Sequence, residues 1–243
     1  MPTNAATDRR AAPTAQAAWL EQLGGAEAYN RWIFDTIRPF VAGRTLEVGC
    51  GIGTFSRLLA GAAAHLTAVD IEAPFVAATE RATAGRANTT VICADATQYP
   101  WPQSFDTIVA LEVIEHIADD AAFLRTLGGA LAPGGRLVLK VPALPALYGA
   151  YDHAVGHHRR YDRRGLGARL AEAGLEVATI AYFNAAGALG WWLHSRVLGR
   201  TRPSGAQVRV FDAAVPMLRR LERAVPPPFG LSLFAVATRS VPQ

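Results

Sequence analysis

The chain has 243 residues, of which 51% are hydrophobic and 18% charged, and its formal net charge is +4. This length suits one α/β domain with an insertion better than two independent domains. Lys140 is the only lysine, so arginines carry the positive charge, and because they are spread along the chain the charge alone predicts no nucleic-acid partner.

Three patterns that the sequence lacks bear on the cellular location of the protein and on its domain limits. No stretch reaches the roughly 18 apolar residues of a membrane span, and residues 1–15 lack the apolar core of a signal peptide. Cys50 and Cys93 show no metal-type spacing, which favours reduced thiols and a cytoplasmic location. We therefore expect a disordered tail over 1–15 and a single domain over 16–243.

Apolar spacing predicts the elements in chain order. Residues 17–41 return to one helical face with a break at Gly24–Gly25, which predicts two helices in an N-terminal cap over 16–42. Short apolar strands then alternate with helices, as in a sheet covered on both faces. The predicted strands are 44–48, 65–70, 89–94, 105–111, 136–141 and 175–182, and the helices between them are 54–62, 74–84, 120–131 and 163–173.

The alternation of strands and helices changes after residue 184, which predicts a helical insertion near the C-terminus of the chain. Helices are expected over 185–198 and 207–225, inside an insertion spanning 184–228, before a last strand over 231–238. The whole predicts an α/β fold with a doubly wound, mostly parallel seven-stranded sheet.

The strongest motif runs from Leu46 to Phe55, L-E-V-G-C-G-I-G-T-F, where the first strand turns into a helix. Glycines at such a turn let the backbone approach a nucleotide. A dinucleotide fingerprint, G-x-G-x-x-G, would need its last glycine at Thr54, so the G-x-G-x-G spacing matches a pyrophosphate turn imperfectly. Glu47 suits a cationic amino group better than a phosphate, and Asp95 ends the third strand where it could accept from an adenine amine.

These residues, with Ala132-Pro133-Gly134-Gly135 before the fifth strand, resemble the class I S-adenosylmethionine (AdoMet)-dependent methyltransferase family over about residues 29–173. The resemblance implies a Rossmann-like methyltransferase fold and AdoMet as cofactor. It places Gly49 and Gly51 along the methionine part, Asp70 on the ribose hydroxyls, and Asp95 and Ala96 at the adenine. The implied cofactor residues are Tyr29, Glu47, Gly49, Gly51, Asp70, Ile71, Asp95, Ala96, Leu111 and Glu112.

The motifs that bear on the methyl acceptor are less specific than those for the cofactor. Glu112-x-x-Glu115-His116 resembles the ubiquinone and small-molecule O-methyltransferase branch, whereas the Asn/Asp-Pro-Pro-aromatic and Pro-Cys sequences of DNA-base methyltransferases are absent here. The resemblance implies methylation of a small or lipid-like molecule, on oxygen ahead of nitrogen or carbon, with no nucleic acid as partner. A protein or RNA methyltransferase and a non-catalytic AdoMet-binding protein remain alternatives.

Histidines are the candidate bases. His116 follows the fourth strand, and His157 and His158 follow the fifth, so the two loops could converge above the cofactor. Alternatively these side chains cap helices, or Glu112, Glu115, His116 and a downstream histidine hold a divalent metal; no metal ligand is assigned. The 184–200 segment carries Trp191 and Trp192 with arginines nearby, and it either packs on the sheet or contacts an amphiphilic acceptor or a membrane surface.

Overall fold

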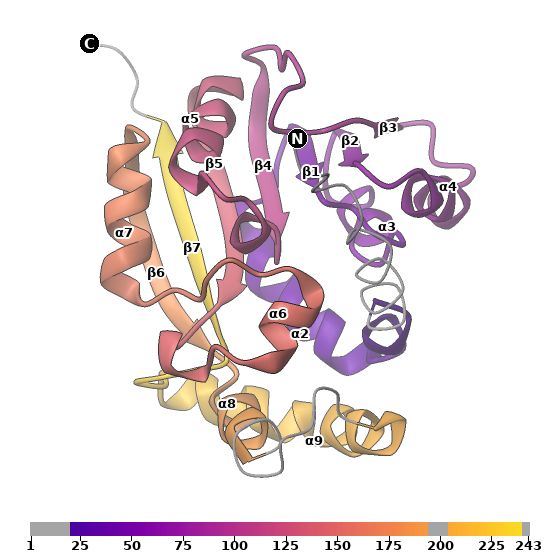
Figure 1. Ribbon diagram of the computed structural model, residues 1–243. Coiled ribbons are helices and arrows are strands. Elements are labelled where there is room, and N and C mark those ends of the chain that lie inside the picture. The colour runs from indigo at the N-terminus through magenta and orange to yellow at the C-terminus, as the bar shows by residue number, and fades with distance from the viewer. Residues whose placement is uncertain (1–19, 194–203, 240–243) are drawn as a thin grey trace, which may run out of the picture.

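The computed structural model describes residues 20–193 and 204–239. Its framework is one seven-stranded sheet of order β3-β2-β1-β4-β5-β7-β6 (Figure 1). β7 runs antiparallel to β5 and β6, and the other pairs are parallel. This confirms the predicted doubly wound, mostly parallel sheet. The strands are β1 (Arg44–Val48), β2 (His65–Asp70), β3 (Thr89–Cys93), β4 (Phe105–Leu111), β5 (Leu131–Pro142), β6 (Leu175–Phe183) and β7 (Ser232–Arg239).

Helices bury both faces of the sheet because successive strand residues point to opposite sides. Ile108 of β4 packs in one apolar cluster with residues of α5 (Asp120–Ala130) and α7 (Arg163–Glu172). Its neighbour Val109 belongs to the opposite cluster, which contains residues of α2 (Glu27–Ile37), α3 (Ser56–Leu59) and α9 (Gly205–Ala224). α4 (Ala73–Ala82) lies beside β2 and β3.

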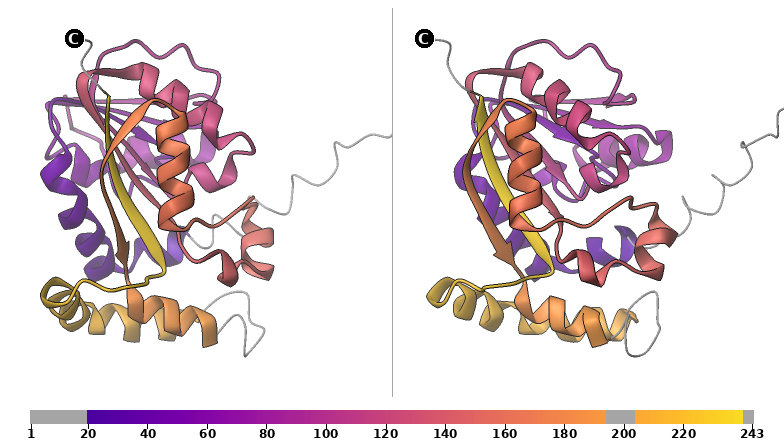
Figure 2. Two further views of the ribbon diagram at one scale, coloured as in Figure 1. Left: turned by 90° about the vertical axis from the view of Figure 1, so that its left-hand side faces the viewer. Right: turned by 60° about the vertical axis from the view of Figure 1, so that its left-hand side comes forward.

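Most of the remaining elements lie at the carboxyl edge of the parallel strands. Two helices, α8 (Ala185–Trp191) and α9, form a layer beneath this edge (Figures 1 and 2). Two short 3-10 segments, η2 (Ile114–His116) and η3 (Pro145–Leu147), follow β4 and β5, and α6 (Ala150–Val155) comes next. A third, η1 (Arg38–Phe40), follows α2 and lies at the opposite edge, where the Phe40 carbonyl accepts the hydroxyl of Thr107 near the start of β4. Segments far apart in the chain therefore meet at one edge of the sheet.

Some element limits differ from those predicted. The helix expected over 54–62 is only the four-residue α3. β5 begins at Leu131 rather than at 136, because Leu131 pairs with Phe105 of β4. The next pair joins Arg136 to Thr107, so the register shifts between the two pairs, and Pro133 and Gly134 lie in this irregular part of the ladder. α6 was not expected. The predicted tail over 1–15 and residues 16–19 of the predicted cap lie outside the described residues. So do residues 194–198 of the helix predicted over 185–198.

Candidate active site

A cavity of about 570 Å³ opens at the carboxyl edge of the sheet, between the strand-end loops and the inner faces of α8 and α9. All ten residues that the sequence assigns to the cofactor line it, and so do His116 and His157. His158 is exposed and is not among the lining residues; its backbone N–H donates to the Glu115 carbonyl at 2.7 Å. The structure thus brings twelve of the thirteen candidate residues to one cavity.

Two glycines of the loop after β1 have no room for a side chain. Gly49 and Gly53 adopt φ of 72° and 81°, in the left-handed region that favours glycine. A Cβ at Gly49 would lie 2.6 Å from Val113 Cγ2, and one at Gly53 would lie 2.8 Å from the Cβ of Ala82. The loop can therefore follow this path, with its backbone exposed to a ligand, only with glycine at these positions.

Asp70 at the end of β2 holds the loop in place. Its carboxylate accepts the backbone N–H of Gly51 at 2.9 Å and that of Glu72 at 3.0 Å. Burial raises the pKa of Asp70, and these backbone donors partly offset the effect. Each carboxylate oxygen can accept more than one hydrogen bond, so both retain capacity for ribose hydroxyls.

Glu47 is a buried carboxyl in the cavity wall. Only 4% of the residue is exposed, and its Oε2 has no hydrogen-bond partner among the described residues. Burial raises the pKa of Glu47 to about 8, with Ser56 opposing the shift and Asp70 adding to it. A buried acid of this kind is stabilised by a cationic partner, and the ammonium of a methionine moiety is a fitting one.

The residues expected at the adenine lie after β2 and β3. The hydroxyl and the backbone N–H of Thr97 donate to Asp95 Oδ1 at 2.6 and 2.9 Å, and these bonds lower the pKa of Asp95. Ile71 is 62% exposed although it lines the cavity. An exposed apolar side chain beside an ionised carboxylate suits a flat ring with an exocyclic amine, as adenine has.

An ion pair in the cavity wall joins the residue after β4 to β5: the Lys140 side chain is buried, at 6% exposed, whereas that of Glu112 is 38% exposed. Glu112 adopts φ of 57°, its backbone N–H donates to the Lys140 carbonyl at 2.7 Å, and its carboxylate pairs with the Lys140 ammonium. Burial opposes the charge of Glu112, but the ammonium outweighs it and holds the pKa of that carboxyl below its ordinary value. Ser232 Oγ of β7 also donates to Glu112, at 3.3 Å. The strained backbone at the end of β4 is therefore held by two strands.

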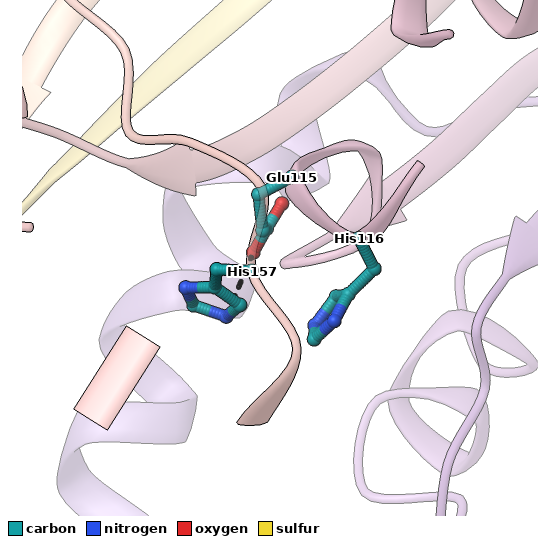
Figure 3. A group of neighbouring side chains, drawn as sticks. All are labelled: Glu115, His116 and His157. Carbon is teal, nitrogen blue, oxygen red and sulfur yellow. Dashed lines mark ion pairs between the residues drawn. The ribbon is translucent and has the colours of Figure 1, made fainter. Parts of the chain in front are cut away.

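Three titratable side chains meet at the far end of the cavity: Glu115, His116 and His157 (Figure 3). Glu115 is fully buried, and burial together with the charge of Glu112 raises its pKa well above the ordinary value. Burial lowers the pKa of His116 to about 4, so this ring is neutral at pH 7. The His157 ring packs edge-on to it at 4.6 Å between centroids, with its Nε2 3.9 Å from Glu115 Oε1.

His157 is oriented by a carboxylate that the sequence analysis did not single out. Asp152 of α6 is fully buried, and its Oδ1 lies 2.9 Å from His157 Nδ1 and 2.8 Å from Arg160 Nε. Burial opposes the charge of Asp152, but His157 and Arg160 outweigh it and lower its pKa. In the tautomer whose Nδ1–H donates to this carboxylate, Nε2 is left as the hydrogen-bond acceptor of the ring.

Aromatic side chains complete this end of the cavity. Tyr151 of α6 packs edge-on against Trp191 of α8 at 4.7 Å between ring centroids, and the Arg160 guanidinium lies over the same indole at 5.5 Å. Phe211 of α9 also lines the wall and packs edge-on against Tyr29 at 5.5 Å. The cofactor end and the histidine end thus share one continuous, largely apolar space.

Comparison with known proteins identifies the family of the chain. A profile of the methyltransferase-domain family matches residues 16–180. An uncharacterized methyltransferase of Mycobacterium bovis is 31% identical over 137 residues, covering 55% of this chain and 68% of its own. A ubiquinone biosynthesis O-methyltransferase of Pseudomonas paraeruginosa is 33% identical over 166 residues, covering 61% and 71%.

Solved structures share the fold. An S-adenosylmethionine-dependent methyltransferase from Mesorhizobium loti superposes with a TM-score of 0.62 at 20% identity, over 88% of this chain and all of its own. An N-methyltransferase from Bradyrhizobium japonicum in complex with S-adenosylhomocysteine gives 0.57 at 16% identity, over 88% and 86%. The chain belongs to the methyltransferase-domain family, and it is an AdoMet-dependent methyltransferase.

Proposed function

We propose that this enzyme transfers the methyl group to an oxygen of a small or lipid-like acceptor. The observation that carries the proposal is the Asp152–His157 pair at the end of the cofactor cavity, where an acceptor hydroxyl would lie. The relative from Pseudomonas paraeruginosa, named for O-methylation in ubiquinone biosynthesis, supports the same class of reaction.

His157 is the base of the proposed reaction. AdoMet supplies an activated methyl group on a sulfonium, and the residues described above fit it along the glycine loop. Transfer to oxygen requires loss of the hydroxyl proton, which His157 Nε2 accepts while Asp152 stabilises the charged ring. His116, whose pKa is about 4, is too weakly basic for this step and remains a neutral hydrogen-bonding group. Tyr151 and Trp191 provide the apolar wall that excludes water.

A divalent metal is the second candidate for activating the acceptor oxygen. One ligand atom from each of Glu115, His116 and His157 lies within 4.8 Å of the others (Figure 3). Such a mixed oxygen and nitrogen set could bind a cation that lowers the pKa of a bound hydroxyl. Loss of activity with a chelator and recovery with Mg²⁺ or Zn²⁺ would assign this role, whereas unchanged activity would leave His157 as the base.

The acceptor is identified by incubating the protein with tritiated AdoMet and fractionated extract of the source organism. We expect label in the small-molecule or lipid fraction, and loss of it in His157→Gln. His153→Gln is the matched control, because His153 is exposed and is not among the cavity-lining residues. Label in protein or RNA would assign the macromolecular alternative, and AdoMet binding without labelling of any fraction would indicate a non-catalytic protein.

We also propose a cytoplasmic location. Both cysteines, Cys50 and Cys93, are free thiols, which suits a reducing compartment. Fractionation of cells that express the tagged protein tests this location.

A further inference from the structure

Exposed hydrophobic side chains gather on α8, on α9 and on the segments that follow them. Among the described residues, only Ile71 and Val177 are large, exposed and apolar outside this region. A concentration of this kind on one part of a surface commonly marks a binding face. The clustered residues are Leu189, Trp192, Leu193, Val210, Met217, Leu221, Val225 and Phe229.

The stripe on α9 has a regular geometry. Val210, Met217 and Leu221 are 72%, 67% and 62% exposed, and their spacing of seven and four residues places them along one line of the helix. Arg209 and Arg220, both exposed, each precede one of these residues and form a parallel basic line. The outer face of α9 therefore has an apolar half and a basic half.

The acidic residues of α9 are turned away from this face. Asp212 accepts the backbone N–H groups of Ala28 and Tyr29 in α2, and Glu222 accepts those of Asn184 and Ala185 at the start of α8. No other carboxylate occurs between residues 204 and 225. The positive charge of the outer face is therefore not offset along the helix.

We propose that the outer face of α8 and α9 binds an anionic lipid bilayer. The apolar stripe would enter the boundary between headgroups and acyl chains while the arginines contact lipid phosphates. No helix in the described ranges is long and apolar enough to cross a membrane. Trp191 and Phe211, on the same two helices, line the cavity, which places its acceptor end next to the membrane.

A second copy of the chain fits this face less well. A two-fold contact brings the same patch of both subunits together, so the line of Arg209 and Arg220 would lie close to the same line of the partner. Like charges at such short range oppose association, whereas phosphate groups favour it.

Co-sedimentation with phospholipid vesicles tests the proposal without any acceptor. We expect the protein to bind vesicles of phosphatidylcholine with phosphatidylglycerol and to bind pure phosphatidylcholine far less. Arg209→Gln/Arg220→Gln should weaken binding to the mixed vesicles by about 25-fold, since each basic residue near an anionic surface contributes about a factor of five. Arg81→Gln/Arg86→Gln removes the same charge from the exposed surface of α4 and the turn after it and should have little effect.

The apolar stripe is tested separately. Met217→Gln/Leu221→Gln leaves the charge unchanged and should weaken vesicle binding by on the order of tenfold or more. Trp192, which is 52% exposed, should shift its fluorescence to shorter wavelength on vesicles, and Trp192→Phe should remove most of that shift. Unchanged S-adenosylhomocysteine affinity in each variant shows that it is folded.

Three outcomes would overturn the proposal: no sedimentation with anionic vesicles, equal binding by the stripe variant, or equal losses in the α4 control. If the stripe variant instead abolishes a concentration-dependent dimer seen by sedimentation velocity, the face is an interface between copies of the chain.

Discussion

The carboxylate of Asp212 on α9 accepts the backbone N–H of Tyr29 at 2.8 Å, although the two residues are 183 positions apart. The same carboxylate accepts the N–H of Ala28 at 3.2 Å, so it caps the start of α2 from outside that helix. Tyr29 lines the cavity, and therefore a residue of the insertion positions a cavity-lining residue of the N-terminal cap.

Replacing this cap should weaken cofactor binding. In Asp212→Ala the first turn of α2 loses its acceptor, which typically costs about 1–2 kcal/mol, and part of that loss should appear as up to about tenfold weaker S-adenosylhomocysteine binding by calorimetry. Asp35→Ala is the control, because it removes a different contact between α2 and α9, the ion pair with Arg219, without touching the start of α2. Equal affinity in Asp212→Ala would show that Tyr29 is placed without the cap.

Asp70→Ala should weaken the affinity for both AdoMet and S-adenosylhomocysteine by roughly 10- to 100-fold. The reason is the loss of a charge-assisted acceptor, which contributes about 1.5–3 kcal/mol. Asp106→Ala removes a comparable bond, from the Arg44 N–H at 2.7 Å, at the opposite end of the sheet and should leave affinity unchanged. Parallel losses in both variants would point to a general loosening of the sheet.

Glu47 should couple cofactor binding to pH. With its pKa raised to about 8, this carboxyl is protonated at pH 7 in the cofactor-free protein, and an incoming ammonium should displace nearly one proton. Calorimetry in buffers of different ionisation enthalpy measures that release, and affinity should increase between pH 6 and 7.5. Glu47→Gln should release no proton at this site, and a wild-type protein that also releases none would refute the assignment.

The same group should make stability depend on pH. A raised folded-state pKa means that the native protein binds more protons than the unfolded chain, so this contribution is complete below pH 4.5 and is lost as pH rises through about 8. Comparing the denaturation midpoints of wild type and Glu47→Gln across pH 5 to 9 isolates the contribution of Glu47, and the difference should change in favour of Gln as pH rises.

Activity should depend on the Nε2 atom of His157. Once an acceptor is known, His157→Gln should lower the rate by about 100-fold or more, because the group that accepts the hydroxyl proton is lost. Asp152→Asn should act in the same direction by disturbing the orientation of the ring. Near wild-type turnover in His157→Gln would mean that positioning alone drives the reaction.

Much of the cofactor region could be predicted because it depends on local sequence. Glu47, Asp70 and Asp95 lie at or just beyond strand ends, and the carboxyl ends of parallel strands always meet at one edge. The sequence-based prediction of AdoMet as cofactor is confirmed by the family match, whereas the roles of the individual residues remain predictions.

The acceptor region could not be predicted to the same depth. α6 has only six residues, too few to show a helical period, and Asp152 becomes visible as a partner of His157 only when the path of this loop is known. The path of the loop also determines which of two neighbouring histidines reaches the cavity: His157 lines it, whereas His158 is exposed. This path depends on contacts between distant parts of the chain, which the local sequence does not reveal.

The ion pair between Lys140 and Glu112 allows selective chemical labelling of the cavity wall. Lys140 is the only lysine of the chain, so a reagent that acylates lysine amines can modify a lysine only at this position. That amine reacts only when its proton leaves and the pair with Glu112 opens. The rate of lysine acylation, followed by mass spectrometry, therefore measures how often the cavity wall becomes accessible to the reagent. A bound cofactor should slow the acylation.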